Sequence, residues 1–156
     1  MLEHCKNAKE RWGGVNDLID KWLHERQDLL VLYCDLSTNI EDGLFEVAAN
    51  QLRTLCQLLV DYVSAGHFEI YDQLVKEGRA FNDTEGLQEA SKLFSIIDLS
   101  TEYALDFNDK YLETDDLRSL SNDLSTLGEK LATRFESEDR VIHVLHDAHK
   151  ATHPKA

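Results

Sequence analysis

The sequence is almost without proline: Pro154 is its one proline, and only two of the 156 residues follow it. Proline breaks helix interiors and marks many loops. The 153 residues before it also hold just seven glycines, which are the other common helix breakers. The shortage of both residue types predicts a chain dominated by long helices.

Long apolar runs and paired cysteines are missing as well. No stretch approaches the roughly 18 apolar residues of a membrane span, and the opening MLEHCKNAKE lacks the apolar segment of a secretory signal. Cys5, Cys34 and Cys56 are odd in number and form no CxxC pair. Such cysteines are typical of reduced thiols, so we expect a cytoplasmic protein that does not enter a membrane. The length favours one domain spanning residues 1–156.

Basic residues are scarce, with 16 Lys and Arg against 30 Asp and Glu, for a net charge of −14. The imbalance is uneven. Residues 61–116 hold fourteen acids and four bases, a net −10, whereas residues 1–60 total −4 and residues 117–156 total zero. An acidic surface repels phosphate backbones, so direct nucleic-acid binding is disfavoured. The charge favours a basic partner, although it could serve solubility alone.

Four segments carry apolar residues at alternating spacings of three and four, which is the pattern of helices that pack in a bundle. They are Val15–Leu36, Phe45–Tyr62, Leu87–Tyr111 and Leu124–Leu145. Amphipathic helices joined by short connections predict an all-α, antiparallel four-helix bundle with short extra helices.

The connections carry their own signals in the first half of the chain. Gly13-Gly14 predicts a break between a short first helix and a longer one, and STNIEDG at 37–43 predicts a turn. Gly66 follows the second apolar seam, where helices often end or bend. We expect positive φ there, followed by a short helix over 67–76.

In the second half, EGRAFNDTEG at 77–86 predicts a loop. Thr84 within it is a candidate N-cap for the next helix. ETDD at 113–116 predicts a helix start, because acidic residues suit the first turn. We expect the tail 151–156 to fray.

Two of the seams contain a charged residue, Arg26 in the first and Glu138 in the last. Buried charges need partners, so we expect an interior polar cluster of Arg26, Glu138, His67 and Asp139. A structural network that fixes helix register would look like this, and so would a metal site in a bundle core. No histidine follows Glu138 at three or four residues, and an arginine would repel a dication.

Three histidines near the end, His146, His149 and His153, share one face if the last helix continues. Three imidazoles could hold zinc, but a solvated face has the same spacing. The motifs GxSxG, GxxxxGK[ST], HExxH and GxGxxG are absent. We therefore expect no enzyme and no cofactor or metal, with a metal-binding or enzymatic bundle built on the interior polar cluster as the alternative.

Three stretches resemble the Rsd/AlgQ family of bacterial regulators of the housekeeping sigma factor, and more closely its AlgQ branch. They are DKWLHERQDLLVLYCDL at 20–36, LCQLLVDYVSAGHFEIYDQL at 55–74 and RFESEDRVI at 134–142. The resemblance implies an all-helical anti-sigma factor that sequesters the primary sigma subunit of RNA polymerase. It implies binding chiefly to sigma region 4, the helix-turn-helix that reads the −35 promoter element.

The resemblance also assigns roles to residues. Asp61 matches the acid of the family's Leu-Val-Asp-Tyr motif, so the resemblance implies a sigma contact there. Glu69 and Asp72 join it as candidate contacts because of their charge and position. The four members of the interior polar cluster also match family motif positions, whereas residues 43–50 match poorly.

Overall fold

The computed structural model describes residues 8–114 and 116–150 of the chain. Its elements are α1 (Ala8–Glu41), α2 (Phe45–Ala65), the π-helical turn η2 (Gly66–Ile70), α3 (Tyr71–Ala80), α4 (Thr84–Leu112), α5 (Leu120–Leu145) and the 3-10 turn η3 (Asp147–His149). The expected fraying of 151–156 lies outside the described residues, as does Cys5.

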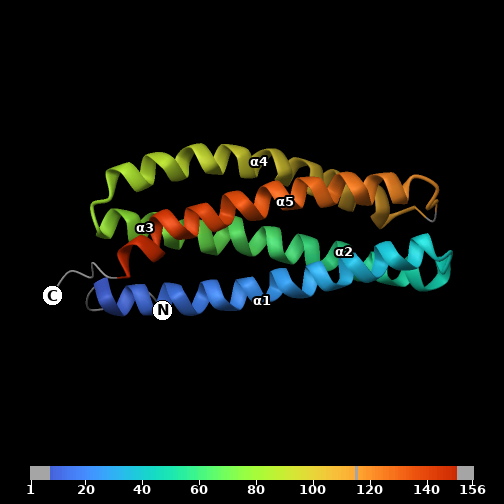
Figure 1. Cartoon of the computed structure of the whole chain (residues 1–156), viewed down its shortest axis with the longest axis horizontal. Helices are drawn as coiled ribbons and strands as arrows, with labels where there is room; N and C mark the ends of the chain where they lie inside the picture. Colours follow the sequence, from blue (N-terminus) through green and yellow to red (C-terminus); the bar gives the residue numbers. More distant parts are fainter. Residues whose placement is uncertain (1–7, 115, 151–156) are drawn as a thin grey trace.

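The long helices form an elongated antiparallel bundle (Figure 1). Helix α1 packs on α2, α2 on α4, α4 on α5 and α5 on α1, which places α2 and α5 diagonally across the bundle. Short α3 continues α2 through η2 and packs against α1, α4 and α5. The prediction of an all-α, antiparallel four-helix bundle with short extra helices is confirmed.

The core follows the four predicted seams. Its fully buried aliphatic side chains include Leu29, Leu36, Leu55, Leu59, Ile97, Leu127 and Leu145. Burying each one stabilises the fold by about 1.5–3 kcal/mol relative to exposure. Trp22 stacks flat on Tyr62, with ring centroids 4.7 Å apart. In the described part of the chain, no helix is apolar over a length that could cross a bilayer.

The first predicted interruption is wrong, and the second is shifted toward the C-terminal end of the predicted stretch. Helix α1 runs unbroken through Gly13 and Gly14 and continues to Glu41, so most of the predicted turn at 37–43 is helical. Val15 and Ile19 are buried just after the glycine pair, and this packing outweighs the roughly 1 kcal/mol helix penalty of each glycine. The reversal is confined to residues 42–44. There Gly43 adopts φ 75°, and the Leu44 N–H donates to the Asn39 carbonyl at 2.9 Å.

The start signals predicted for α4 and α5 are displaced. Helix α3 reaches Ala80, so the loop shrinks to 81–83, and Asp83 rather than Thr84 caps α4 by accepting the Gly86 N–H at 2.9 Å. Glu113 and Asp116 do not start a helix, and α5 begins at Leu120. Instead, Asp116 accepts bonds from the backbone N–H and guanidinium of Arg118 within the loop.

The predicted bend at Gly66 exists in a different form. Gly66 has ordinary helical angles, φ −57° and ψ −56°, so the expectation of positive φ is wrong. The turn η2 is π-helical, and the Tyr71 N–H bonds to the Gly66 carbonyl. A Cβ on Gly66 would lie 3.0 Å from the Tyr71 hydroxyl and 3.1 Å from Trp22. Glycine is therefore needed for close packing and not for a left-handed backbone.

Candidate functional site

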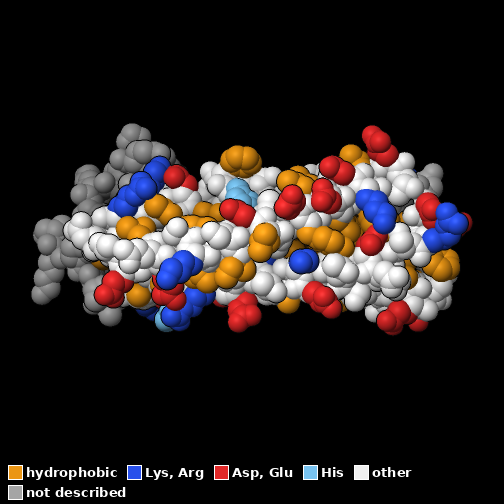
Figure 2. Space-filling model, turned by 90° about the horizontal axis from the view of Figure 1, so that it is seen from above, with side chains coloured by type: hydrophobic (Ala, Val, Ile, Leu, Met, Phe, Trp, Pro, Cys, Tyr) orange, Lys and Arg blue, Asp and Glu red, His pale blue; other side chains and the backbone are white. Residues whose placement is uncertain are grey.

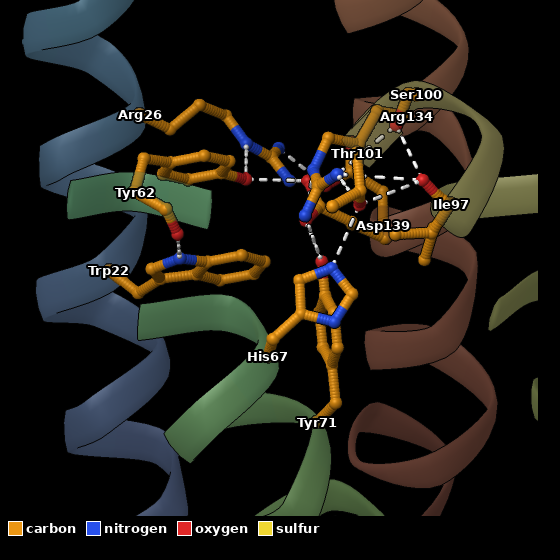
Figure 3. A network of polar contacts seen from close by, with 11 residues as sticks. Trp22, Arg26, Tyr62, His67, Tyr71, Ile97, Ser100, Thr101, Arg134 and Asp139 are labelled. Atoms are coloured by element: carbon orange, nitrogen blue, oxygen red, sulfur yellow. Dashed lines mark hydrogen bonds and ion pairs between the residues drawn. The ribbon is translucent and has the colours of Figure 1, made fainter. Parts of the chain in front are cut away.

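A buried carboxylate, Glu138 of α5, lies near the middle of the bundle and is 1% exposed. Its Oε1 accepts bonds from the Tyr62 hydroxyl at 2.5 Å and from Arg26 Nη2 at 3.3 Å. Its Oε2 accepts from Arg134 Nε at 3.2 Å and from the Tyr71 hydroxyl. These four donors match the roughly four lone-pair positions of a carboxylate. We call Glu138 and these donors the Glu138 network (Figure 3).

Arg134 is the second buried charge of the network and is 0% exposed. Besides Glu138, its guanidinium donates to Thr101 Oγ1 at 2.7 Å, to Ser100 Oγ at 3.1 Å and to the Tyr71 hydroxyl at 3.0 Å. Every nitrogen of the guanidinium thus has an acceptor, which a buried cation requires. Arg134 thereby ties α5 to α4 and α3.

Arg26 connects this interior to the surface. Its Nε donates to the Tyr62 hydroxyl at 3.0 Å, and its Nη1 donates to the exposed carboxylate of Asp139 at 2.6 Å. The guanidinium also lies 4.6 Å from the ring centroid of Phe135, within cation–π range. Burial opposes its charge, but Tyr62, Asp139 and Glu138 together outweigh burial, so the pKa of Arg26 is raised.

The electrostatics keep the donors protonated. Burial, followed by the Glu138 charge, raises the pKa values of Tyr62 and Tyr71 well above that of a free phenol. Burial also raises the pKa of Glu138, opposed by the charge of Arg134 and by the two tyrosine bonds. Both tyrosines therefore donate hydrogen bonds throughout the physiological pH range.

His67 lies beside the Glu138 network rather than on the carboxylate. Its Nε2 is 2.8 Å from Thr101 Oγ1, the same hydroxyl oxygen that accepts from Arg134. Its ring meets Tyr71 edge-on at 5.0 Å. Burial and then the positive charge of Arg134 lower the pKa of His67, and Asp98 opposes this shift. Of the predicted interior cluster, the structure brings three residues into direct contact and joins His67 through Thr101.

The saturated carboxylate limits what this site can do. Its lone pairs are occupied by two guanidiniums and two hydroxyls, which leaves no ligand position for a metal. Two arginines face the charges of Glu138 and Asp139, so the network is balanced. This is the arrangement of a network that fixes helix register, the first of the two alternatives that the sequence leaves open.

Sequence reasoning missed Arg134 and the hydroxyls of Tyr62 and Tyr71. Arg134 precedes Glu138 by four residues, and this spacing places both on one helix face. That spacing was the available signal. No comparable signal existed for the tyrosines, because an apolar ring fits a seam whether or not its hydroxyl has a partner.

The three predicted surface contacts lie along α2, η2 and α3, and all are exposed. Asp61 accepts a bond from Gln57 at 2.9 Å, and Asp72 pairs with Lys76 at 3.0 Å. Glu69 lies in η2, two turns beyond Asp61. Their proposed role in binding a partner stays a prediction.

The histidines near the end take separate partners. Helix α5 ends at Leu145, so the condition for one shared histidine face is not met. His146 is buried, with Nδ1 2.8 Å from Glu77 and Nε2 3.0 Å from Asn16. His149 stacks on Phe81 and contacts Asp83 at 2.8 Å. His153 lies outside the described residues.

The fold and the Glu138 network together define an acidic all-α bundle whose helices are connected by buried ion pairs and hydrogen bonds. A sequence model of the Rsd/AlgQ family, described as regulators of the RNA polymerase sigma(70) subunit, matches residues 1–146. The chain belongs to this family.

Two proteins that share the name Regulator of sigma D are similar to the chain over nearly its whole length. A protein named Regulator of sigma D from Salmonella arizonae is 37% identical over 155 residues, which cover 95% of this chain and 93% of the relative. Another of that name, from Shigella dysenteriae serotype 1, is 36% identical over 161 residues and covers 99% of each.

Proposed function

We propose that this protein binds the primary sigma subunit of RNA polymerase one-to-one, through sigma region 4, and thereby regulates transcription as an anti-sigma factor in the cytoplasm. The observation that carries the proposal is membership of a family of sigma(70) regulators. Exposed Asp61 marks the face that we assign to the contact.

The charge of the chain supports this partner. Sigma region 4 reads promoter DNA and is therefore basic, and the net −10 of residues 61–116 gives the bundle the opposite sign. Complementary fields speed association and orient the two proteins. Charged pairs at the rim of an interface add little affinity, so apolar contacts beside the acids must supply much of it.

The mechanism is competition for one surface. A region 4 that is held against the bundle has its DNA-reading helix covered, so it loses its −35 contacts. No bond is made or broken in this scheme. The Glu138 network contributes by holding α1, α2 and α5 in register beneath the binding face.

The test is to titrate the protein into transcription from a −35-dependent promoter. We expect transcription to fall as the protein approaches the concentration of sigma. Asp61→Lys should weaken sigma binding at least about ten-fold, because the new positive charge would face a basic partner surface and like charges repel. Its melting temperature should stay near wild type.

The matched control is Glu136→Lys, the same change of charge on exposed Glu136 of α5, diagonally across the bundle from α2. It should bind sigma with nearly wild-type affinity. Undiminished transcription at a large molar excess of folded protein would reject the anti-sigma proposal. Equal losses of sigma affinity in Asp61→Lys and Glu136→Lys would reject the assignment of the sigma contact to the face that carries Asp61.

A further inference from the structure

The most exposed large hydrophobic side chain among the described residues is Phe68, which is 85% exposed. It lies in η2, the one π-helical turn of the described chain. Such turns interrupt a helix at a cost and occur frequently at functional sites. Phe68 is thus a solvent-exposed aromatic ring at a type of turn that is frequent at functional sites.

The neighbours of Phe68 fix its outward position. Gly66 lies so close to Trp22 that a Cβ there would be 3.1 Å from the indole ring. The His67 Nε2 lies 2.8 Å from Thr101 Oγ1, and Ile70 is 3% exposed. Gly66, His67 and Ile70 are thus held toward the interior while Phe68 and Glu69 are exposed, and these inward contacts restrict the backbone of η2. An aromatic side chain on a constrained backbone loses less entropy on binding than one on a flexible loop, which favours its use as an anchor.

Carboxylates and an apolar side chain lie on the same turn as this ring and on the neighbouring side of α4. Glu69 is the next residue along η2 and is exposed. On α4, Asp98 and Leu105 lie three and four residues from Thr101, so they share the side of the helix that meets His67. Leu105 is 45% exposed, and Asp98 is near enough to act on the charge of His67. We call Phe68, Glu69, Asp98 and Leu105 the Phe68 surface.

The two segments that carry this surface contain no basic residue, although Lys21 of α1 lines the same groove as Glu69. Residues 61–75 and 93–109 contain three and four acids respectively, seven in all, and no Lys or Arg. Figure 2 shows hydrophobic and acidic side chains over the face of α4, with separate Lys and Arg side chains between them. The occupant that this charge fits is a basic protein surface with an apolar recess.

We propose that Phe68 is the apolar anchor of the sigma interface and inserts into an apolar recess, rimmed by Lys and Arg, between helices of region 4. The inference rests on the proposed function and deepens it. Asp61 lies seven residues before Phe68, two helical turns or roughly 10 Å away, so one partner can cover both. A central aromatic ring supplies affinity while the surrounding carboxylates set orientation and rate.

The test compares two phenylalanine variants for binding to full-length primary sigma by calorimetry. Phe68→Ala should weaken the Kd at least about ten-fold. Phe45→Ala, the control, removes the same ring from a 54% exposed position at the other end of α2, and its Kd should stay within about two-fold of wild type. Phe68→Leu, which keeps an apolar side chain, should fall between Phe68→Ala and wild type and covers the case of an unfolded alanine variant.

The outcomes separate the two proposals. Wild-type affinity in Phe68→Ala, with sigma still bound, would overturn the anchor and leave the proposed function standing. No binding by the wild type would overturn both. Sedimentation of the free protein tests whether a second copy of the chain occupies the Phe68 surface instead of sigma. A wild-type dimer that Phe68→Ala dissociates would assign the surface to self-association and overturn the sigma anchor.

Discussion

At the scale of residues, Glu138 contacts two guanidiniums inside the bundle, and Asp139 supplies the second negative charge at its edge. Arg134 is fully buried, and Arg26 is largely so, with an 11% exposed side chain. Neither can leave the interior without unpacking a helix. Removing the Glu138 charge therefore leaves the Arg134 cation without a carboxylate partner and out of reach of water.

Glu138→Gln should lower the free energy of unfolding by about 3–5 kcal/mol, the usual loss when a buried ion pair loses one partner. Chemical denaturation measures it. Asp139→Asn is the control, because Asp139 is 59% exposed and also bonds Arg26. It should cost less than about 1 kcal/mol. Similar small losses in both variants would mean that the network adds little to stability.

Partners within the network were only partly predictable. Arg26 and Glu138 stand out because each puts a charge into an apolar seam, and pairing them needs no coordinates. The hydroxyls of Tyr62 and Tyr71 converge on one carboxylate because α2 and α3 are joined by a π-helical turn. The apolar pattern of a single sequence carries no information about such a turn.

At the scale of elements, η2 determines how α2 and α3 meet the rest of the bundle. Its packing rests on the absence of a side chain at Gly66. Gly66→Ala should therefore destabilise by about 1–3 kcal/mol through overpacking, even though alanine is the better helix former.

The control for that change is Gly13→Ala. Gly13 also lies in a helix, and nothing stands within 4 Å of a Cβ built there. This variant should gain about 0.5–1 kcal/mol. Thermal melts of the two alanine variants decide the matter: a stabilised Gly66→Ala would show that Trp22 and Tyr71 move aside freely.

The cap of α4 provides a pH-dependent prediction. The Gly86 N–H, and then the His149 contact, hold the pKa of Asp83 below its ordinary value despite partial burial. The unfolded chain has a pKa near about 3.9. The stabilisation by the carboxylate is therefore fully present above that pH and is lost as pH falls through the folded pKa.

Asp83→Ala should cost about 1 kcal/mol at neutral pH, and its difference from wild type should shrink below about pH 4. Melts across pH 3–7 measure this. Thr84→Ala serves as the control, since Asp83 and not Thr84 caps the helix, and its effect should not depend on pH. A constant Asp83→Ala deficit down to pH 3 would contradict the cap.

Element boundaries were less predictable than the elements themselves. Four seams were enough to place four long helices, because burial of an apolar stripe dominates helix stability in a bundle. Glycine pairs, acidic clusters and Thr84 are local signals of smaller energy. Packing of Val15 and Ile19 overrides the glycines, and Asp116 satisfies the Arg118 backbone instead of starting a helix.

At the scale of the whole molecule, the net charge of −14 sets the long-range field. For a basic partner, this field should raise the association rate at low salt. Stopped-flow mixing with sigma should show that rate falling steeply between about 0.05 and 0.5 M salt, as the screening length drops below about 10 Å. The dissociation rate should change much less. An association rate that does not change with salt concentration would show that electrostatic steering has no part in the proposed binding to sigma.

The ends of the bundle have a mechanical consequence. Trp12 donates to the His146 carbonyl at 2.9 Å and stacks on its ring, so the start of α1 and the end of α5 meet at one end of the rod (Figure 1). A force that pulls these two points apart breaks the contacts between α1 and α5 sequentially, one helical turn after another, and not all together. The bundle should therefore yield to small tension, however high its resistance to heat.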